Sequence, residues 1–256
     1  MCGRYVMPDD DAIGEYWAIS CRAWLPTILP RFNVAPAAQV PIVVRRPDGA
    51  LESRIARWGL IPRWWKTDAP PARTFNARSE DAAHKPAWRE SLRSSRCLMP
   101  ARGWYEWNAN EPARSESGRA GGQPYFLFCP GEKIIAFAGI WSVWERPGSA
   151  PVASCALLTR KAAPGLSAIH PRMPVVLRPE RQAAWLDPAA TADGIQALLA
   201  GAREDVSCHP VSTRVNDARN DFPELMDPDA RPLPRPPGDL FEAMADGGRD
   251  HPSFSR

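Results

Sequence analysis

The chain has 256 residues, a net charge of +3, 44% hydrophobic residues and 24% charged residues. This length is near the upper limit for a single hydrophobic core, so we expect one domain over residues 2–228 and a tail over 229–256. No run approaches the roughly 20 apolar residues of a bilayer span, and the first residues lack the apolar region of a signal peptide, which excludes a membrane protein and favours an intracellular, cytoplasmic one.

The first part of the chain predicts short elements separated by prolines. These elements are a helix near residues 9–20, a loop over residues 31–36, and strands at 40–46 and 52–58. Ser79 is suited to cap a helix over about residues 80–93, because acidic residues occupy its first turn and Arg89 and Arg93 lie toward its end.

Short apolar or alternating runs dominate the second part of the chain. They predict strands at 96–99, 103–108, 124–129, 133–144, 152–159 and 173–178, an exposed hairpin loop over 109–123, and helices at 179–187 and 191–202. We therefore expect an α+β fold: a single domain with a curved, mostly antiparallel, barrel-like sheet flanked by short helices. From about residue 229 the composition is rich in Pro, Asp, Gly and Arg, which predicts a disordered tail.

Positive charge and tryptophan are concentrated in the middle of the chain. Residues 53–120 hold 13 Arg or Lys against 7 Asp or Glu, together with six of the eleven tryptophans. Arginines can meet phosphates while aromatic rings stack on unpaired bases, so this composition favours binding of single-stranded nucleic acid. The alternative is that most of these tryptophans belong to the core.

Cys2 is the most informative single position. Its side chain is small enough for Met1 to be removed by a methionine aminopeptidase, which leaves an α-amine and a thiol on the same residue. The amine has a reference pKa of roughly 7.7 to 8.0 and can condense with an aldehyde, after which the thiol can close a five-membered thiazolidine ring. The alternative is an ordinary buried cysteine. The six cysteines form no Cys-x-x-Cys pair and no zinc-type cluster, so neither disulfides nor a metal site is indicated.

Four other positions carry chemistry that has a plain structural alternative. Glu106 lies in an alternating aromatic run, where an inward side chain would have a raised pKa and suit proton transfer, whereas an outward one would be a salt-bridge partner. His170 can transfer a proton, or it can be a hydrogen-bonded structural histidine. Taken from the residues alone, Asn76 and Arg78 fit a turn between a strand and a helix.

Eight motifs follow one another along residues 2–228. They read Cys2-Gly3-Arg4-Tyr5, Arg31-Phe32-Asn33-Val34-Ala35-Pro36, Trp58-Gly59-Leu60-Ile61-Pro62 with Trp64-Trp65, Phe75-Asn76-Ala77-Arg78-Ser79-Glu80, Arg96-Cys97-Leu98-Met99-Pro100, Gly103-Trp104-Tyr105-Glu106-Trp107, Phe137-Ala138-Gly139-Ile140-Trp141 and Ile169-His170-Pro171-Arg172-Met173-Pro174. Together they resemble the SRAP (SOS response-associated peptidase) family of abasic-site processing proteins.

The resemblance implies a covalent reaction with damaged DNA. Cys2 matches the family's nucleophile, which forms a thiazolidine with the ring-opened aldehyde of an abasic nucleotide and so gives a stable crosslink that shields the lesion. Asn76 is expected to orient the reacting sugar, Glu106 to move protons, and His170 to assist opening of the deoxyribose ring and reversal of the crosslink, a lyase-type activity. Autoproteolytic removal of residues before the cysteine has been proposed for the family, but here only Met1 precedes Cys2.

The same resemblance predicts the DNA contacts and the partners. Phosphate contacts are expected from Arg4, Arg78 and Arg172, and a wedge against the bases from Pro62, Trp64 and Trp65. We expect single-stranded DNA containing abasic sites as the partner and the replication machinery as a further one. We also expect a monomer without cofactor, metal or membrane attachment that is cytoplasmic and associates with the nucleoid when it acts.

Two other readings stay open at the level of sequence. A glutamine amidotransferase can also begin Met-Cys-Gly and use the freed amine as the base for its own thiol. A noncovalent module for single-stranded DNA could use the same arginines and tryptophans and leave Cys2 without a role.

Overall fold

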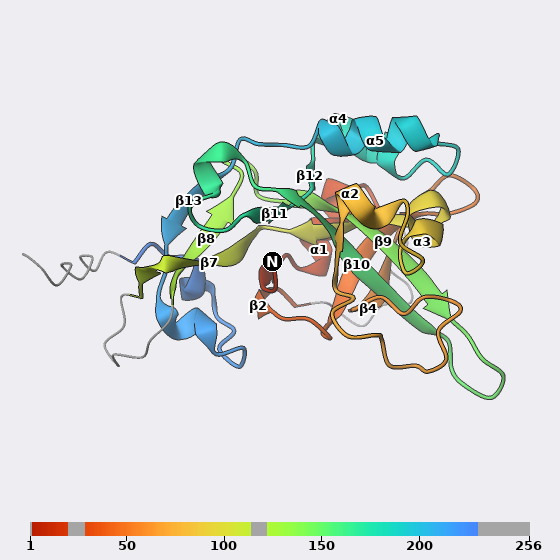
Figure 1. The fold of residues 1–256 in the computed structure, drawn as a ribbon, viewed down its shortest axis with the longest axis horizontal. Coiled ribbons are helices and arrows are strands. Elements are labelled where there is room, and N and C mark those ends of the chain that lie inside the picture. The colour runs from red at the N-terminus through yellow and green to blue at the C-terminus, as the bar shows by residue number, and fades with distance from the viewer. Residues whose placement is uncertain (1, 20–28, 114–121, 230–256) are drawn as a thin grey trace, which may run out of the picture.

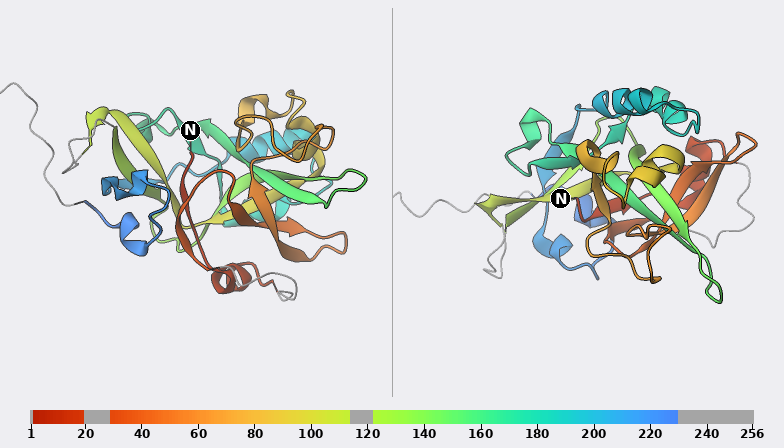
Figure 2. Two further views of the ribbon diagram at one scale, coloured as in Figure 1. Left: turned by 90° about the horizontal axis from the view of Figure 1, so that it is seen from below. Right: turned by 45° about the vertical axis from the view of Figure 1, so that its right-hand side comes forward.

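The computed structural model describes residues 2–19, 29–113 and 122–229. Within these residues two β-sheets pack together, and short helices cover the outer wall of the larger one (Figure 1, Figure 2). The predicted tail lies outside the described residues from residue 230 onward. So do residue 20 of the first predicted helix and residues 114–121 of the predicted hairpin loop.

The larger sheet closes on itself as a barrel. Within the described residues its ring of hydrogen-bonded strands runs β10–β4–β3–β6–β9 and returns to β10, and only the β10–β4 pairing is parallel. Its members are β3 (Gln39–Arg45), β4 (Leu51–Trp58), β6 (Arg96–Ala101), β9 (Ile135–Trp144) and β10 (Val152–Lys161). Three short strands extend the ring: β5 (Asn76–Arg78) and β11 (Arg172–Pro174) on β10, and β12 (Val176–Leu177) on β9.

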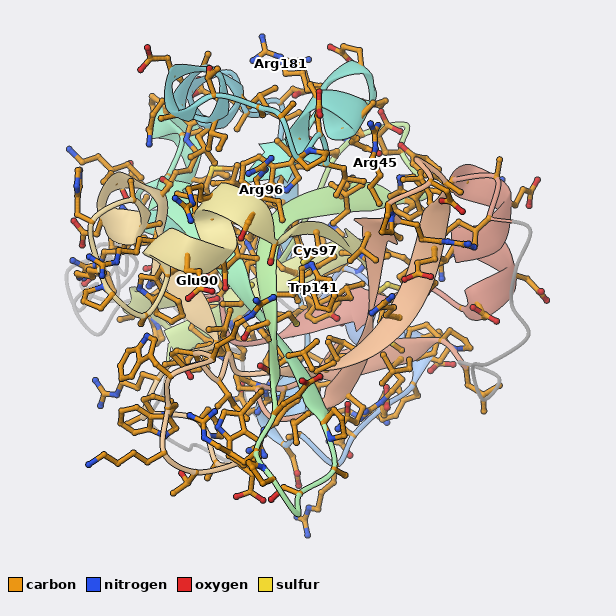
Figure 3. All side chains as sticks on the ribbon, turned by 90° about the vertical axis from the view of Figure 1, so that its right-hand side faces the viewer. Arg45, Glu90, Arg96, Cys97, Trp141 and Arg181 are labelled. Carbon is orange, nitrogen blue, oxygen red and sulfur yellow. The ribbon has the colours of Figure 1, made fainter. Side chains whose placement is uncertain are left out.

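Alternation along the strands separates the barrel interior from its outer wall. In β3, Val40, Ile42 and Val44 belong to the interior cluster, whereas Val43 packs with the helices outside. Each such buried aliphatic side chain contributes about 1.5 to 3 kcal/mol through loss of apolar surface to water. Cys97 also belongs to the interior cluster, the partly buried Trp141 packs against it, and Figure 3 shows both near the middle of the strand ring.

The smaller sheet is antiparallel, and its order within the described residues is β13–β8–β7–β1–β2. Its strands are β1 (Tyr5–Met7), β2 (Arg31–Val34), β7 (Gly103–Pro112), β8 (Gly122–Phe128) and β13 (Ser207–Pro210). The chain passes from the barrel to this sheet at Arg102, between β6 and β7. Gly103 is needed at this passage, because a Cβ atom there would lie 2.4 Å from the ring of Phe126. One apolar cluster runs from the barrel interior to the facing side of this sheet.

Helices cover the barrel wall and connect the sheets. The described helices are α1 (Asp10–Tyr16), α2 (Ser79–Ala82), α3 (Arg89–Ser94), α4 (Pro179–Trp185) and α5 (Ala192–Ala200), with 3-10 turns η1 (Pro164–Leu166), η2 (Thr213–Asn216) and η3 (Pro223–Met226). None of the helices in this described part has the length and apolar character that a bilayer span requires. The predicted fold class is confirmed: a mixed α and β architecture with a mostly antiparallel, barrel-forming sheet.

Several predicted boundaries are wrong for identifiable reasons. The single helix expected over 80–93 is divided into α2 and α3, because Pro86 lacks the N–H of a helix interior and restricts the residue before it. Ser79 does not cap α2 but is its first residue. The expected loop at 31–36 contains β2, which pairs with β1. The strand expected at 103–108 continues to Pro112, and the one expected at 173–178 is divided into β11 and β12.

Arg96 ties the helices to the barrel and gives a test of this packing. Its buried guanidinium donates to the carbonyls of Leu92 at 2.8 Å, Arg93 at 2.6 Å and Trp185 at 2.7 Å, and also to that of Asp187. These carbonyls lie at or just beyond the ends of α3 and α4, where helical partners are missing.

We expect Arg96→Lys to lower the free energy of unfolding by about 2 to 4 kcal/mol, because an ammonium cannot reproduce this planar set of hydrogen bonds. Urea unfolding measures the loss. Arg89→Lys, at an exposed position of α3, is the matched control and should change stability by less than about 0.5 kcal/mol. An equal effect of the two variants would contradict this role for Arg96.

Candidate active site at the start of the chain

Cys2 lies three residues before the start of β1 and is fully buried, with 0% of its surface exposed. The side-chain amide of Asn76 donates to the carbonyl oxygen of Cys2 over 2.6 Å. Asn76 is the first residue of β5, which runs parallel to β10 and places Asn76 opposite Leu157. The Oδ1 atom of Asn76 is buried and has no hydrogen-bond partner among the described residues, so a polar acceptor remains beside Cys2.

Glu106 lies on β7 and is 3% exposed, so its side chain faces the interior. Burial penalises its charged form and raises its pKa to about 7. The pKa of the Cys2 thiol is raised well above its usual value, first by burial and then by the nearby negative charge of Glu106. At neutral pH the thiol is therefore protonated, while the neighbouring carboxyl group is close to its own titration point.

His170 approaches Glu106 from the segment between η1 and β11. Its Nδ1 atom lies 3.8 Å from Glu106 Oε2 and receives a hydrogen bond from the Arg172 N–H over 3.1 Å. Burial lowers the pKa of His170, so the imidazole is mainly neutral at physiological pH. When Nδ1 accepts from Arg172, the ring proton is on Nε2, where the imidazole can donate it.

These four residues form one continuous group, although they come from four separate segments of the chain. Asn76 donates to the Cys2 carbonyl, the charge of Glu106 acts on the Cys2 thiol, and Glu106 Oε2 lies 3.8 Å from His170 Nδ1. The group brings together a thiol, a carboxyl group, an imidazole and an amide. Such a set is suited to the addition of a nucleophile to a carbonyl carbon with proton transfers near neutral pH.

The three arginines predicted to contact phosphates have different surroundings. Arg4 donates to Asn33 Oδ1 over 2.9 Å and to the Val215 carbonyl over 3.0 Å. Arg172 donates to both carboxylate oxygens of Glu80. Arg78 is exposed and makes no ion pair within the described part of the chain. Arg78 is thus the arginine whose fork is most available to an external phosphate.

The predicted wedge lies in the long loop between β4 and β5, residues 59–75. Gly59 begins this loop with a φ of 146°, a conformation that favours glycine. Pro62 is buried, but Trp64 is 52% exposed. Trp65 is partly buried. Its carbonyl accepts hydrogen bonds from the side chains of Trp144 and Arg146, which connect the loop to β9 and to the residues after β9. The two tryptophans therefore differ: Trp64 presents its ring to solvent and Trp65 anchors the loop.

Two residues of this region had no predicted role. Asn33 is fully buried, and its amide donates to the carbonyls of Val215 at 3.1 Å, Asp217 at 3.0 Å and Asn220 at 2.9 Å. Glu80 binds Arg172 with both carboxylate oxygens. Both residues stand within the motifs quoted above. A polar residue at a fixed place in a motif is therefore the signal that could have found them.

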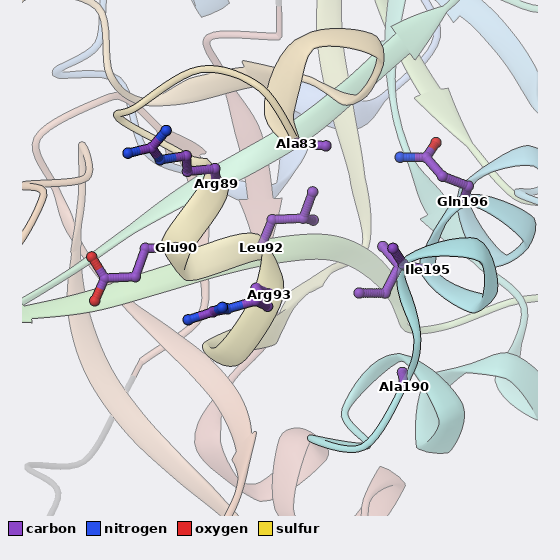
Figure 4. Close-up of a pocket in the computed structure, with 9 residues that line it drawn as sticks. Ala83, Arg89, Glu90, Leu92, Arg93, Ala190, Ile195 and Gln196 are labelled. Atoms are coloured by element: carbon purple, nitrogen blue, oxygen red, sulfur yellow. The ribbon is translucent and has the colours of Figure 1, made fainter.

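Other parts of the structure add no residue to this group. A groove of about 770 Å³ lies between α3 and α5, and its lining includes the buried Leu92 and Ile195 and the exposed Arg89 and Arg93 (Figure 4). It includes none of the predicted site residues. Over residues 2–19, 29–113 and 122–229, no group of three or more His, Cys, Asp or Glu side chains is arranged to hold a metal ion.

Comparison of sequences identifies relatives over most of the chain. The family model described as SOS response associated peptidase (SRAP) matches residues 1–218. The abasic site processing protein YoqW of Bacillus subtilis (strain 168) is 33% identical over 235 residues, covering 89% of this chain and 99% of that protein. The abasic site processing protein HMCES of Gallus gallus is 32% identical over 231 residues, covering 78% of this chain and 66% of that protein.

Comparison of structures gives the same fold. A protein from Bordetella bronchiseptica solved by X-ray crystallography superposes with a TM-score of 0.67 at 23% identity, covering 82% of this chain and 100% of that chain. A phage-related protein from the same organism superposes with a TM-score of 0.61 at 27% identity and covers 82% of this chain and 94% of that chain.

The raised pKa of Glu106 predicts a pH-dependent stability. The folded state binds the Glu106 proton more tightly than the unfolded state does. The stabilisation of the folded state by this proton is therefore complete below pH 4.5 and is lost as the pH rises through about 7. Across this window we expect wild type to lose roughly 3 kcal/mol relative to Glu106→Gln, which cannot ionise.

Urea unfolding at pH 4.5 and pH 8 measures this difference. Glu90→Gln, which removes an exposed carboxylate from α3, controls for the change of net charge. A Glu106→Gln variant whose stability follows that of wild type at both pH values would show that the carboxyl group is not desolvated.

Proposed function

The chain belongs to the SOS response associated peptidase (SRAP) family, and from this premise we propose that it captures abasic sites in single-stranded DNA. In this proposal Cys2, exposed as the first residue by loss of Met1, forms a covalent thiazolidine with the aldehyde of the abasic sugar. The observation that carries the proposal is the continuous group formed by Cys2, Asn76, Glu106 and His170. The names of the relatives from Bacillus subtilis and Gallus gallus support the same substrate.

The proposed reaction begins with the amine of Cys2. Its nitrogen adds to the aldehyde carbon to give a carbinolamine, which loses water to form a Schiff base. The Cys2 sulfur then adds to the same carbon, the thiol proton passes to the imine nitrogen, and the five-membered ring is closed. The sum is one aldehyde and one aminothiol converted to one thiazolidine and one water, with no oxidant or reductant.

The electrostatics of the site support this order of events. The Cys2 thiol is buried and its pKa is raised, so little thiolate exists at neutral pH to attack first. Glu106, with a pKa of about 7, can accept the thiol proton as the ring closes and return a proton to the nitrogen. The amine therefore leads, and the thiol reacts when the electrophilic imine is already beside it.

His170 and Asn76 have supporting roles in the proposal. An abasic sugar is mostly a closed ring, and its ring oxygen must gain a proton when the ring opens. A neutral imidazole with its proton on Nε2 can supply that proton, and Glu106 Oε2, 3.8 Å from Nδ1, can exchange a proton with the ring through one bridging water. Asn76 holds the Cys2 carbonyl and keeps its own Oδ1 available beside the reacting atoms.

A denaturing gel tests the proposal. The protein is mixed with an abasic single-stranded oligonucleotide and with the same oligonucleotide lacking the lesion. We expect a slower band with the abasic strand alone. Cys2→Ala should abolish the spontaneous band, and borohydride should then trap a reducible Schiff base, because this variant keeps the amine but lacks the sulfur that closes the ring.

Cys208→Ala is the matched control, since Cys208 is a free, partly exposed cysteine on β13. Its band should match that of wild type. A stable band that persists in Cys2→Ala without borohydride would overturn the thiazolidine mechanism. Glutamine hydrolysis with no DNA adduct would assign the chain to the amidotransferase class instead.

We further expect Trp64 rather than Trp65 to stack on the DNA. Trp64→Ala should weaken binding of undamaged single-stranded DNA by about 1 to 3 kcal/mol, the typical contribution of one stacked base, while the melting temperature changes little. Fluorescence anisotropy measures the affinity. Tyr16→Ala, which removes an exposed ring from α1, should leave affinity unchanged. Equal affinities of Trp64→Ala and wild type would refute the assignment.

A further inference from the structure

The guanidinium of Arg172 is bound on two sides by the protein itself. Its Nη1 donates to Glu80 Oε1 over 2.7 Å and its Nη2 to Glu80 Oε2 over 2.9 Å, the paired geometry of a strong arginine–carboxylate contact. Nη2 also donates to the Thr159 carbonyl over 2.7 Å and to Thr159 Oγ1 over 3.2 Å. The pKa of Glu80 is lowered to about 2 chiefly by Arg172, so Glu80 remains ionised at any physiological pH.

This contact spans strand β10. Beyond the barrel, β10 has β5 on one side and β11 on the other: Thr159 is opposite Arg78 of β5 and also opposite Pro174 of β11. Arg172 belongs to β11, and Glu80 follows β5 in α2. The ion pair therefore joins the two segments that flank the end of β10 and fixes their separation.

Each of these two segments carries one residue of the candidate active site. Asn76 begins β5, four residues before Glu80. His170 is two residues before Arg172, and its Nδ1 atom lies 3.1 Å from the Arg172 nitrogen and 2.9 Å from the Arg172 carbonyl oxygen, so it accepts from the N–H or donates to the carbonyl according to its tautomer. The backbone of Arg172 thus orients the imidazole, while the side chain of Arg172 is oriented by Glu80.

We propose that Glu80 is a positioning residue for abasic-site capture, acting through Arg172 to hold His170 and Asn76 in register on either side of β10. The inference rests on the proposed function. Arg172 then has a structural role, because its guanidinium N–H groups already donate to Glu80 and Thr159. Arg78, the exposed last residue of β5, remains the expected phosphate contact of this region.

Two consequences separate this role from a phosphate contact. Removing the carboxylate deletes a negative charge from a surface predicted to bind a polyanion, so noncovalent affinity for DNA should not fall. The rate of the chemical step should fall, because misplacing a reacting group by about 1 Å can slow a reaction by as much as roughly 100-fold. A merely structural contribution would instead lower stability and leave the rate of the folded fraction unchanged.

The test uses the full chain with Glu80→Gln, Arg172→Gln and the double variant. Crosslinking is timed in single-turnover reactions at saturating abasic single-stranded DNA, and affinity is measured separately with undamaged DNA. We expect Glu80→Gln to slow crosslinking roughly tenfold while its dissociation constant stays within about twofold of wild type or becomes tighter. The double variant should be no slower than Arg172→Gln, since both changes break one contact.

Asp81→Asn is the matched control. It removes the next carboxylate of α2, whose ion pair with Lys85 spans 2.9 Å and leaves Arg172 untouched, so it should crosslink at the wild-type rate. Thermal melting verifies that each variant is folded under the assay conditions. Equal rates for Glu80→Gln and wild type, or a slower rate shared by Asp81→Asn, would overturn the positioning role. Absence of crosslinking in wild type would reject the proposed function as well.

Discussion

The pairing of β1 between β2 and β7 determines where the first residues of the chain lie. Chain ends are usually exposed and poorly ordered, yet Tyr5, Val6 and Met7 are all buried. Tyr5 is opposite Trp104, and the Tyr105 N–H donates to the Arg4 carbonyl over 3.0 Å. Because the two strands are antiparallel, the residues before Arg4 run toward the later residues of β7. The register thus brings Cys2 toward Glu106.

Strand β10 positions the other residues of the candidate site, because its two halves pair with different strands. Its first half closes the barrel between β4 and β9, and its second half lies between β5 and β11. The barrel is a rigid base, because its interior is filled by alternating side chains from every strand of the ring. The segments that pair with the second half of β10 are held in place by this rigid base. The residues that they carry, Asn76 and His170, are therefore positioned by a packed core although they lie outside it.

Local patterns predicted most strands but not the contacts between distant segments. Apolar and alternating runs identified most of the barrel strands, and the helix expected near residues 9–20 begins at Asp10, where Asp9 caps it. The division of the helix after Ser79 could also have been foreseen from Pro86. In contrast, the binding of Arg172 by Glu80 joins residues 92 positions apart, and nothing local to either residue encodes it. The grouping of Asn76 with His170 likewise came from resemblance to a family, because from its own neighbours Asn76 resembles a turn residue.

The acidity of its thiol does not distinguish Cys2 from the other buried cysteines. Burial also raises the pKa of Cys97 and Cys155, so all three sulfurs are poor nucleophiles when they act alone. What differs is their surroundings: of these three, Cys2 stands at the start of the chain, where Asn76 donates to its carbonyl oxygen and the charge of Glu106, which lies beside His170, acts on its thiol. A protonated, buried thiol resists stray electrophiles and oxidants. In the proposed reaction the thiol becomes reactive after the amine has captured an aldehyde. Burial of the thiol therefore both protects the sulfur and makes its reaction selective for the lesion.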